Sequence, residues 1–301
     1  MVVNRSESGR LLRIATVSAV AVAFTLFLVK LIAWLATDSL SLMASMVDSL
    51  ADGFASLINL LAVSYALMPA DREHRFGHGK AESLAGLVQS AFMAGAALFL
   101  ALSAVDRLIN PQPLERTGWG IAVMLFAMAL TWALVMVQRR AVEQTGSVAV
   151  EADSVHYLSD FLTNGGVILS LLSSRYLGWQ IVDPLCAFGV TVYLGFSAFR
   201  IGGVALNSLL DREFDDPERE RILNIARKNE RVLDVHDLRT RRSGPDAFIQ
   251  LHLEMEDALP LVEAHAIGEA VRLEILREFP EAEVIIHQDP ISTVSPQDRA
   301  H

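Results

Sequence analysis

Long apolar segments separated by short polar stretches dominate the first two thirds of the chain. A transmembrane helix needs ~20 consecutive, mostly apolar residues. Six segments meet that length, and they lie near residues 13–36, 41–68, 82–108, 118–138, 148–173 and 180–205. The pattern predicts an α-helical membrane domain of six transmembrane helices.

The last third of the chain has shorter amphipathic segments, in which apolar and polar residues recur at helix or strand spacing. Residues 215–230 carry apolar positions at helical spacing, with Pro217 in the first turn. Residues 247–256 alternate apolar and polar side chains, which is typical of a half-buried strand. Residues 234–244 predict the hairpin partner of that strand, with a turn at 243–245.

A second helix at 261–279 and a third strand at 282–289 complete this part of the pattern. The order helix, strand, strand, helix, strand predicts a small α+β domain (αββαβ, metallochaperone-like) with its helices on one face of a three-stranded sheet. We therefore expect two domains, a membrane domain over 1–210 and a soluble domain over 211–301.

Charge separates the same two parts of the chain. The net charge is −10, and residues 211–301 hold 21 Asp and Glu against 12 Lys and Arg. So acidic a domain makes nucleic acid an unsuitable partner. Its ~80 residues form a thin core, which a homodimer would strengthen. The single Cys186 excludes an internal disulfide framework and a thiolate metal cluster.

The distribution of basic residues between loops indicates how the membrane domain is oriented, because cytoplasmic loops are rich in Lys and Arg. These residues gather before the first span, between the second and third, and after the fourth: Arg5, Arg10, Arg13, Arg72, Arg75, Lys80, Arg139 and Arg140. With an even number of spans, both termini are expected in the cytoplasm.

Two of the predicted spans contain ionisable residues at one-turn spacing. Asp48 and Asp52 project from one face of the second span, and His156 and Asp160 share the same spacing in the fifth. A charge at the middle of a bilayer costs ~2.5–3.5 kcal/mol or more, so such residues normally mark an ion pathway. Three carboxylates and one imidazole suit a divalent transition metal such as Zn²⁺.

Simpler interpretations stay open for these residues, since an aspartate can cap a helix, pair with a cation or lie at the interface. We interpret Asp38, Glu151 and Asp153 as interfacial because they lie toward span ends. Lys30 is expected to extend its charge to the membrane interface.

A closed set of four ligands favours binding and release over catalysis. Catalytic zinc keeps an open position, and the sequence contains no HExxH motif to supply a general base. Ligand histidine must be neutral and ligand carboxylates ionised, so metal and protons compete. A site reached alternately from each side would exchange metal for protons. A membrane-anchored metal sensor or buffer and a membrane metallohydrolase remain alternatives.

Two further groups of residues have metal-ligand character. A loop between the second and third spans holds Asp71, His74 and His78, which could equally form a solvated, charged turn. The soluble domain carries one histidine on nearly every element, and solvation alone would also explain them. These residues are His236, His252, His265 and His287, with Asp289 two positions after the last.

Several long motifs carry a family resemblance. The stretches "PADREHRFGHGKAE", "EADSVHYLSD", "SLLDRE", "HDLRTR", "FIQLHLEMED" and "VIIHQDP" occur in order along nearly the whole chain. Together with DxxxD in the second span and HxxxD in the fifth, the chain resembles the cation diffusion facilitators, especially their bacterial ferrous-iron/zinc efflux branch. The resemblance implies a homodimeric antiporter of the bacterial inner membrane that exports Zn²⁺, Fe²⁺ or Cd²⁺ against protons.

The resemblance also implies roles for individual residues. Asp48, Asp52, His156 and Asp160 match the transport site of the family, and Asp71, His74 and His78 match its loop site. His236, His252, His265, His287 and Asp289 match a cytoplasmic binuclear site, with Asp289 bridging and Gln288 in the outer shell. Lys80 and Asp211 match a charge interlock, and Val155 matches a gate position that is bulkier in close relatives.

Overall fold

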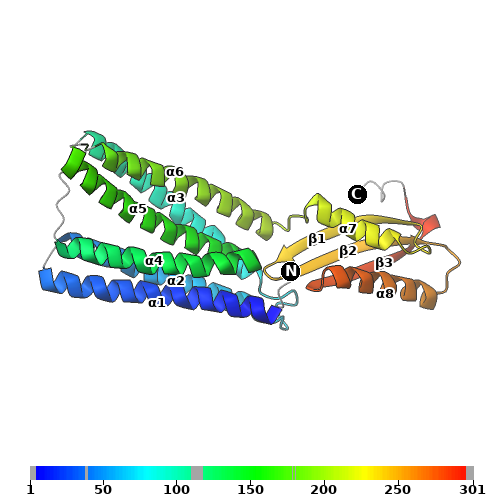
Figure 1. Cartoon of the computed structure of the whole chain (residues 1–301). Helices are drawn as coiled ribbons and strands as arrows, with labels where there is room; N and C mark the ends of the chain where they lie inside the picture. Colours follow the sequence, from blue (N-terminus) through cyan, green and yellow to red (C-terminus); the bar gives the residue numbers. More distant parts are fainter. Residues whose placement is uncertain (1–4, 38–39, 110–117, 178, 180, 296–301) are drawn as a thin grey trace. The chain divides into compact units, whose positions relative to one another are not determined.

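The computed structural model describes residues 5–37, 40–109, 118–177, 179 and 181–295 (Figure 1). Asp38, interpreted above as interfacial, lies outside these residues. The chain divides into two compact units, Met1–Leu206 and Asn207–His301. Each unit is described by itself below.

Long helices form the first unit (Figure 1). They are α1 (Arg5–Thr37), α2 (Leu40–Ala66), α3 (Lys80–Ile109), α4 (Gly118–Thr145), α5 (Val148–Leu177) and α6 (Val182–Leu209). Five of the helices within the described residues, all but α5, are long and apolar enough to cross a membrane. At 30 residues α5 has a matching length but a more polar composition, so its place as a sixth span stays a prediction.

Helix α5 contacts most of the other helices of the first unit. It packs on α3 and α4 and also touches α1 and α2, while α1 packs along α2 and α4. Tyr157 of α5 is buried with Ala19 of α1 and Leu134 of α4. A second apolar cluster joins α5 to α3 and α6 through Val155, Met93, Ala97, Leu194, Ala198 and Ile201. Polar residues of α5 are therefore enclosed by neighbouring helices.

The outer surface of the first unit is apolar. Large side chains such as Phe92, Phe99 and Phe199 are exposed. An exposed apolar surface of this extent is typical of a membrane or protein contact. Together with the five apolar helices, it confirms the predicted helical membrane domain.

The second unit confirms the predicted small α+β domain. Its elements are α7 (Asp216–Arg227), β1 (Asp234–Ser243), β2 (Asp246–Met255), α8 (Leu261–Glu278), β3 (Ala282–Pro290) and the 3₁₀ turn η1 (Ile291–Thr293). The sheet order is β1-β2-β3, with β1 antiparallel and β3 parallel to β2. Gly244, at φ 57°, supplies the left-handed residue that the tight β1–β2 turn requires.

One face of the sheet carries the core of the second unit. The alternate residues Ile249, Leu251 and Leu253 of β2 are buried together with Ile222 of α7 and Ile275 of α8. Because α7 and α8 also contact each other, both helices cover this same face. The side chains between those apolar positions, including His252, therefore project from the opposite face.

We expect the stability of the second unit to depend on this one-sided core. Leu251 is 1% exposed, whereas Leu273 of α8 is 47% exposed. Leu251→Ala should lower the free energy of unfolding by about 2–5 kcal/mol, since it removes buried methyl groups and leaves a cavity. Leu273→Ala is the matched control, with an expected change below about 1 kcal/mol. Denaturant unfolding of the purified chain, followed in this unit, measures both; equal losses would contradict the assignment of the core.

Candidate metal sites

Helices α2 and α5 bring together three of the four residues proposed for the intramembrane site. His156 Nε2 lies 3.0 Å from Asp52 Oδ1 and 3.8 Å from Asp160 Oδ2. One ligand atom from each of these residues lies within 4.8 Å of the other two. The His156 side chain is 25% exposed, so the neighbouring helices cover most of the ring but leave part of it accessible to an ion. Two carboxylate oxygens and one imidazole nitrogen at this separation could hold a divalent transition metal.

Asp48 is the fourth predicted ligand, and its carboxylate lies outside that group of three. It is exposed on α2, one helical turn before Asp52. Asp52, His156 and Lys30 all act on it electrostatically. A ligand one turn away on the same helix has the position from which a rotamer change could complete the set.

A buried polar network surrounds Asp153, which precedes His156 by one turn. Asp153 is 1% exposed, so its interpretation as an interfacial residue is wrong. Its carboxylate accepts hydrogen bonds from Gln138 Nε2 at 2.6 Å, Gln89 Nε2 at 3.2 Å and Ser56 Oγ at 3.5 Å. Ser56 Oγ in turn lies 2.8 Å from the Tyr157 hydroxyl. Four helices thus share one hydrogen-bonded cluster around the Asp153 carboxylate, which joins α5 to its neighbours.

The other ionisable residues of this region have local partners. Glu151 Oε1 accepts a hydrogen bond from Arg200 Nη2 of α6 at 2.5 Å. Lys30, expected to extend to the interface, is instead tied to α2. Its Nζ donates to Ser49 Oγ at 2.5 Å and to the Ser45 carbonyl at 3.1 Å.

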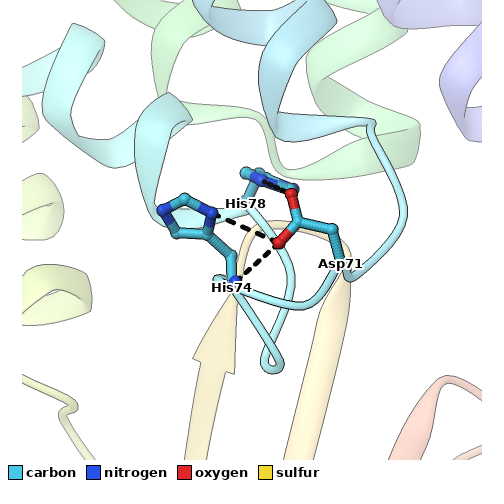
Figure 2. Close-up of side chains that lie close together, drawn as sticks. All are labelled: Asp71, His74 and His78. Carbon is cyan, nitrogen blue, oxygen red and sulfur yellow. Dashed lines mark hydrogen bonds and ion pairs between the residues drawn. The ribbon is translucent and has the colours of Figure 1, made fainter.

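The loop between α2 and α3 forms a second cluster from Asp71, His74 and His78 (Figure 2). Asp71 Oδ1 accepts the backbone amides of His74 at 2.6 Å and Glu73 at 2.8 Å. The His74 amide, with that of Glu73, holds the pKa of Asp71 below its usual range, which favours the ionised form that binds metal.

The two imidazoles of the loop differ in exposure. His78 is buried beneath the ring of Tyr65, 4.5 Å away between ring centroids, and its Nε2 lies 3.3 Å from Asp71 Oδ2. His74 is half exposed, with its Nδ1 3.4 Å from Asp71 Oδ1. The buried Nδ1 of His78 has no hydrogen-bond partner. The loop therefore presents two nitrogens and a carboxylate to a single point.

A row of three histidines crosses the sheet of the second unit. His236 of β1 pairs with His252 of β2, and His252 pairs with His287 of β3. The neighbouring row is acidic, because Glu254 pairs with Asp234 on one side and with Asp289 on the other. Parallel pairing of β3 with β2 sets this register.

Asp289 connects the three imidazoles. Its Oδ2 lies 2.7 Å from His252 Nδ1 and 3.5 Å from His236 Nε2, while its Oδ1 lies 3.1 Å from His287 Nε2. The two oxygens thus face different rings, as a carboxylate shared by two metal ions would. A cavity of about 240 Å³ opens beside His236, His252 and Asp289.

Two residues of the sheet were not foreseen from sequence. Glu254 is fully buried, and its Oε1 lies 3.2 Å from His236 Nδ1 without hydrogen-bond alignment. A carboxylate behind a ligand histidine orients the ring and makes it a better donor. Asp237 occupies a bulge after His236 at φ 46°, and its Oδ2 lies 3.8 Å from His252 Nε2. Only the strand register and the bulge reveal these positions.

Two residues expected at this site lie away from the histidine face of the sheet. His265 is exposed on α8, which covers the opposite face of the sheet, and acts on Glu269 of its own helix. Gln288 faces α8: a Cβ added at Gly268 of that helix would collide with the Gln288 side-chain amide. The period of two along β3 explains this, because Gln288 must point away from its neighbours His287 and Asp289.

Of the remaining predicted residues, Lys80 and Val155 belong to the first unit and Asp211 to the second. Lys80 is the first residue of α3 in the first unit. Asp211, at φ 55°, belongs to the second unit, where its Oδ1 accepts a hydrogen bond from Arg241 Nη1 at 3.3 Å. Val155 is buried in the apolar cluster between α5, α3 and α6. The interlock and the gate stay predictions.

Comparison with known proteins gives consistent matches over both units. Residues 16–210 match the family model described as the cation efflux transmembrane domain, and residues 214–291 match the cation efflux protein, cytoplasmic domain.

Similar curated proteins include cation-efflux pumps named FieF. The chain is 52% identical over 286 residues to FieF of Klebsiella pneumoniae subsp. pneumoniae and of Salmonella arizonae, covering 95% of each chain. It is 51% identical over 286 residues to FieF of Escherichia fergusonii, again covering 95% of both. A solved structure of CzrB (Zn form) is 32% identical, covering 28% of this chain and 98% of that chain with a TM-score of 0.27.

The position of Asp289 generates a prediction for metal binding by the second unit. Asp289→Asn keeps the size of the side chain but removes its charge, so zinc affinity should fall about 10- to 100-fold. The measurement is a zinc titration against a competing chelator, in full-length protein that also carries Asp52→Ala and Asp71→Ala. Glu283→Gln, an exposed carboxylate of the same strand, is the control and should leave the affinity unchanged. Equal affinity of both variants would contradict the role of Asp289.

Proposed function

The chain belongs to the cation efflux family, and from that premise we propose that it is an antiporter that exports a divalent transition metal from the cytoplasm in exchange for protons. Family membership confirms the resemblance to the cation diffusion facilitators drawn from the motifs. Residues 1–210 form the transport domain in this proposal, and residues 211–301 form a cytoplasmic domain that binds metal and dimerises.

The observation that carries the proposal is the cluster of Asp52, His156 and Asp160 between two helices of the membrane domain. Ionisable groups are costly in hydrocarbon, and a divalent cation supplies the counter-charge that these carboxylates need there. Asp48, one turn away, provides the fourth ligand. Alternating access of this site to the two sides of the membrane would carry the ion across.

Proton exchange follows from the chemistry of the same ligands. An imidazole binds metal only when neutral, and a carboxylate binds it best when ionised. Protons that enter from outside would therefore displace metal that entered from the cytoplasm. Hydrolysis fits less well, because both carboxylates of the cluster lie against the imidazole and serve as ligands rather than as a separate general base.

The ligand set suits several metals. Three carboxylates and one imidazole are a harder set than a site with two histidines, so we infer that Fe²⁺ and Cd²⁺ are carried along with Zn²⁺. The relatives, named as cation-efflux pumps, support export as the direction of transport.

The other two clusters are assigned to regulation. The histidine row with Asp289 would bind one or two metal ions when cytoplasmic metal is abundant, and this would tighten a homodimer of the cytoplasmic domains. His265 and Gln288 could enter such a site only after a rearrangement or from the second protomer, since His265 is exposed on α8 and Gln288 faces that helix. Asp71, His74 and His78 would bind a further ion at the cytoplasmic mouth. Placement in the bacterial inner membrane with both termini cytoplasmic belongs to the same proposal.

Zinc uptake by proteoliposomes tests the proposed function. Vesicles with an acidic lumen should accumulate zinc faster than vesicles without a pH gradient. Asp52→Ala removes a ligand and should reduce uptake to that of protein-free vesicles. Asp106→Ala, at the exposed end of α3, is the matched control and should transport like the wild type.

Other outcomes would redirect the assignment. Wild-type protein that binds zinc but gives no flux under either condition would identify a sensor or buffer. A hydrolytic activity that disappears in Asp52→Ala would identify a metallohydrolase. Uptake by Asp52→Ala at the wild-type rate would exclude the intramembrane cluster as the transport site.

A further inference from the structure

Lys30 is a charged residue of the membrane domain that the transport cycle described above does not use. It lies on α1, seven residues before the end of the helix at Thr37. Its ammonium group turns to α2, where it donates to Ser49 Oγ at 2.5 Å and to the Ser45 carbonyl at 3.1 Å. Ser49 is the residue next to Asp48, so the cation is held on the helix that carries two of the proposed ligands.

The charge of Lys30 acts on the carboxylates of the transport site. Asp48, Asp52 and Asp160 all interact with it electrostatically. Among the described contacts none of them forms a hydrogen bond with Lys30, whose Nζ donates to two neutral oxygens. The ammonium group is therefore held beside the transport site by hydrogen bonds to α2, and it does not block the carboxylate oxygens that would bind the metal.

We propose that Lys30 is a fixed internal cation that weakens metal binding at the transport site and thereby permits release. The inference rests on the proposed transport function. Lys30 offsets one of the three carboxylate charges before any metal binds, and its positive charge repels the incoming cation. The site therefore attracts a divalent ion less strongly than three uncompensated carboxylates would. A transporter needs a site that binds strongly enough to load and weakly enough to empty.

Zinc affinity of Lys30 variants tests this role directly. The background is full-length protein with Asp71→Ala and Asp289→Ala, which leaves the transport site as the cluster under study. In that background Lys30→Met should bind zinc at least ~10-fold more tightly, because a neighbouring positive charge has been removed in a site of low effective dielectric. Lys30→Arg, which keeps the charge, should stay within ~threefold of the background.

Two further variants separate charge from structure. Lys30→Gln keeps a polar side chain while losing the charge, and it should tighten binding as Lys30→Met does. Adding Asp52→Ala should abolish the gain in affinity, since the gain belongs to the transport site. In flux measurements on the otherwise wild-type chain, Lys30→Met should lower both the half-saturating zinc concentration and the maximal rate.

The direction of the change distinguishes a charge effect from a packing effect. A residue that only joins α1 to α2 would, when removed, loosen the site and weaken zinc binding. Unchanged or weaker affinity in Lys30→Met and Lys30→Gln, with elution as a single folded species, would overturn the proposal. The affinity measurement does not depend on flux, so a wild-type chain that binds zinc without transporting it would refute the transport function and leave the Lys30 result interpretable.

Discussion

The cost of placing ionised groups in hydrocarbon is the constraint on which the membrane domain depends. Asp52, His156, Asp160 and Asp153 all lie on helices predicted to cross the membrane, where an ionised side chain facing lipid would be costly, and α5 carries three of them. Contacts with α1, α2, α3 and α4 enclose this helix, and its less apolar composition reflects that position. The polar face of α5 is therefore the feature around which the other helices are arranged.

Two different solutions to that constraint lie within one turn of each other on α5. The Asp153 carboxylate accepts hydrogen bonds from Gln89, Gln138 and Ser56, so protein donors stabilise it without a metal. His156 Nε2 lies against carboxylate oxygens of Asp52 and Asp160. A metal cation could bind this nitrogen and these oxygens more strongly than they bind one another. The hydrogen-bonded network around Asp153 would hold α5 in place. The cluster around His156 would remain available to bind and release an ion, as the proposed transport site requires.

In the second unit the corresponding constraint is strand register. The hairpin brings His236 beside His252, and the parallel third strand adds His287, so three histidines separated by up to 51 residues form one row. Asp289 is the point at which they converge, since each of its oxygens reaches a different ring. Helices α7 and α8 cover the other face, so the histidine row lies on the face that neither of these helices covers.

Periodicity was sufficient to predict most of the fold. The long apolar segments predicted the helices, and the alternation over 247–256 together with the turn at Gly244 predicted the hairpin. One-turn spacing predicted that His156 and Asp160 share a face, but it could not show which residue of α2 meets them. Asp153 was misjudged because position along a span does not reveal whether a side chain faces lipid or protein. The opposite orientation of Gln288 follows from the period of two along β3, whereas the buried position of Glu254 beside His236 depends on how the three strands pair, which no local pattern encodes.

Simultaneous recording of zinc and protons tests the proposed exchange of these two ions through the intramembrane cluster. Zinc entry and luminal pH would be followed together in proteoliposomes prepared with an acidic, weakly buffered lumen. Zinc entry is expected to be accompanied by a rise in luminal pH, and Asp52→Ala is expected to abolish both signals. Zinc entry without any pH change beyond that of protein-free vesicles would contradict the proposed exchange.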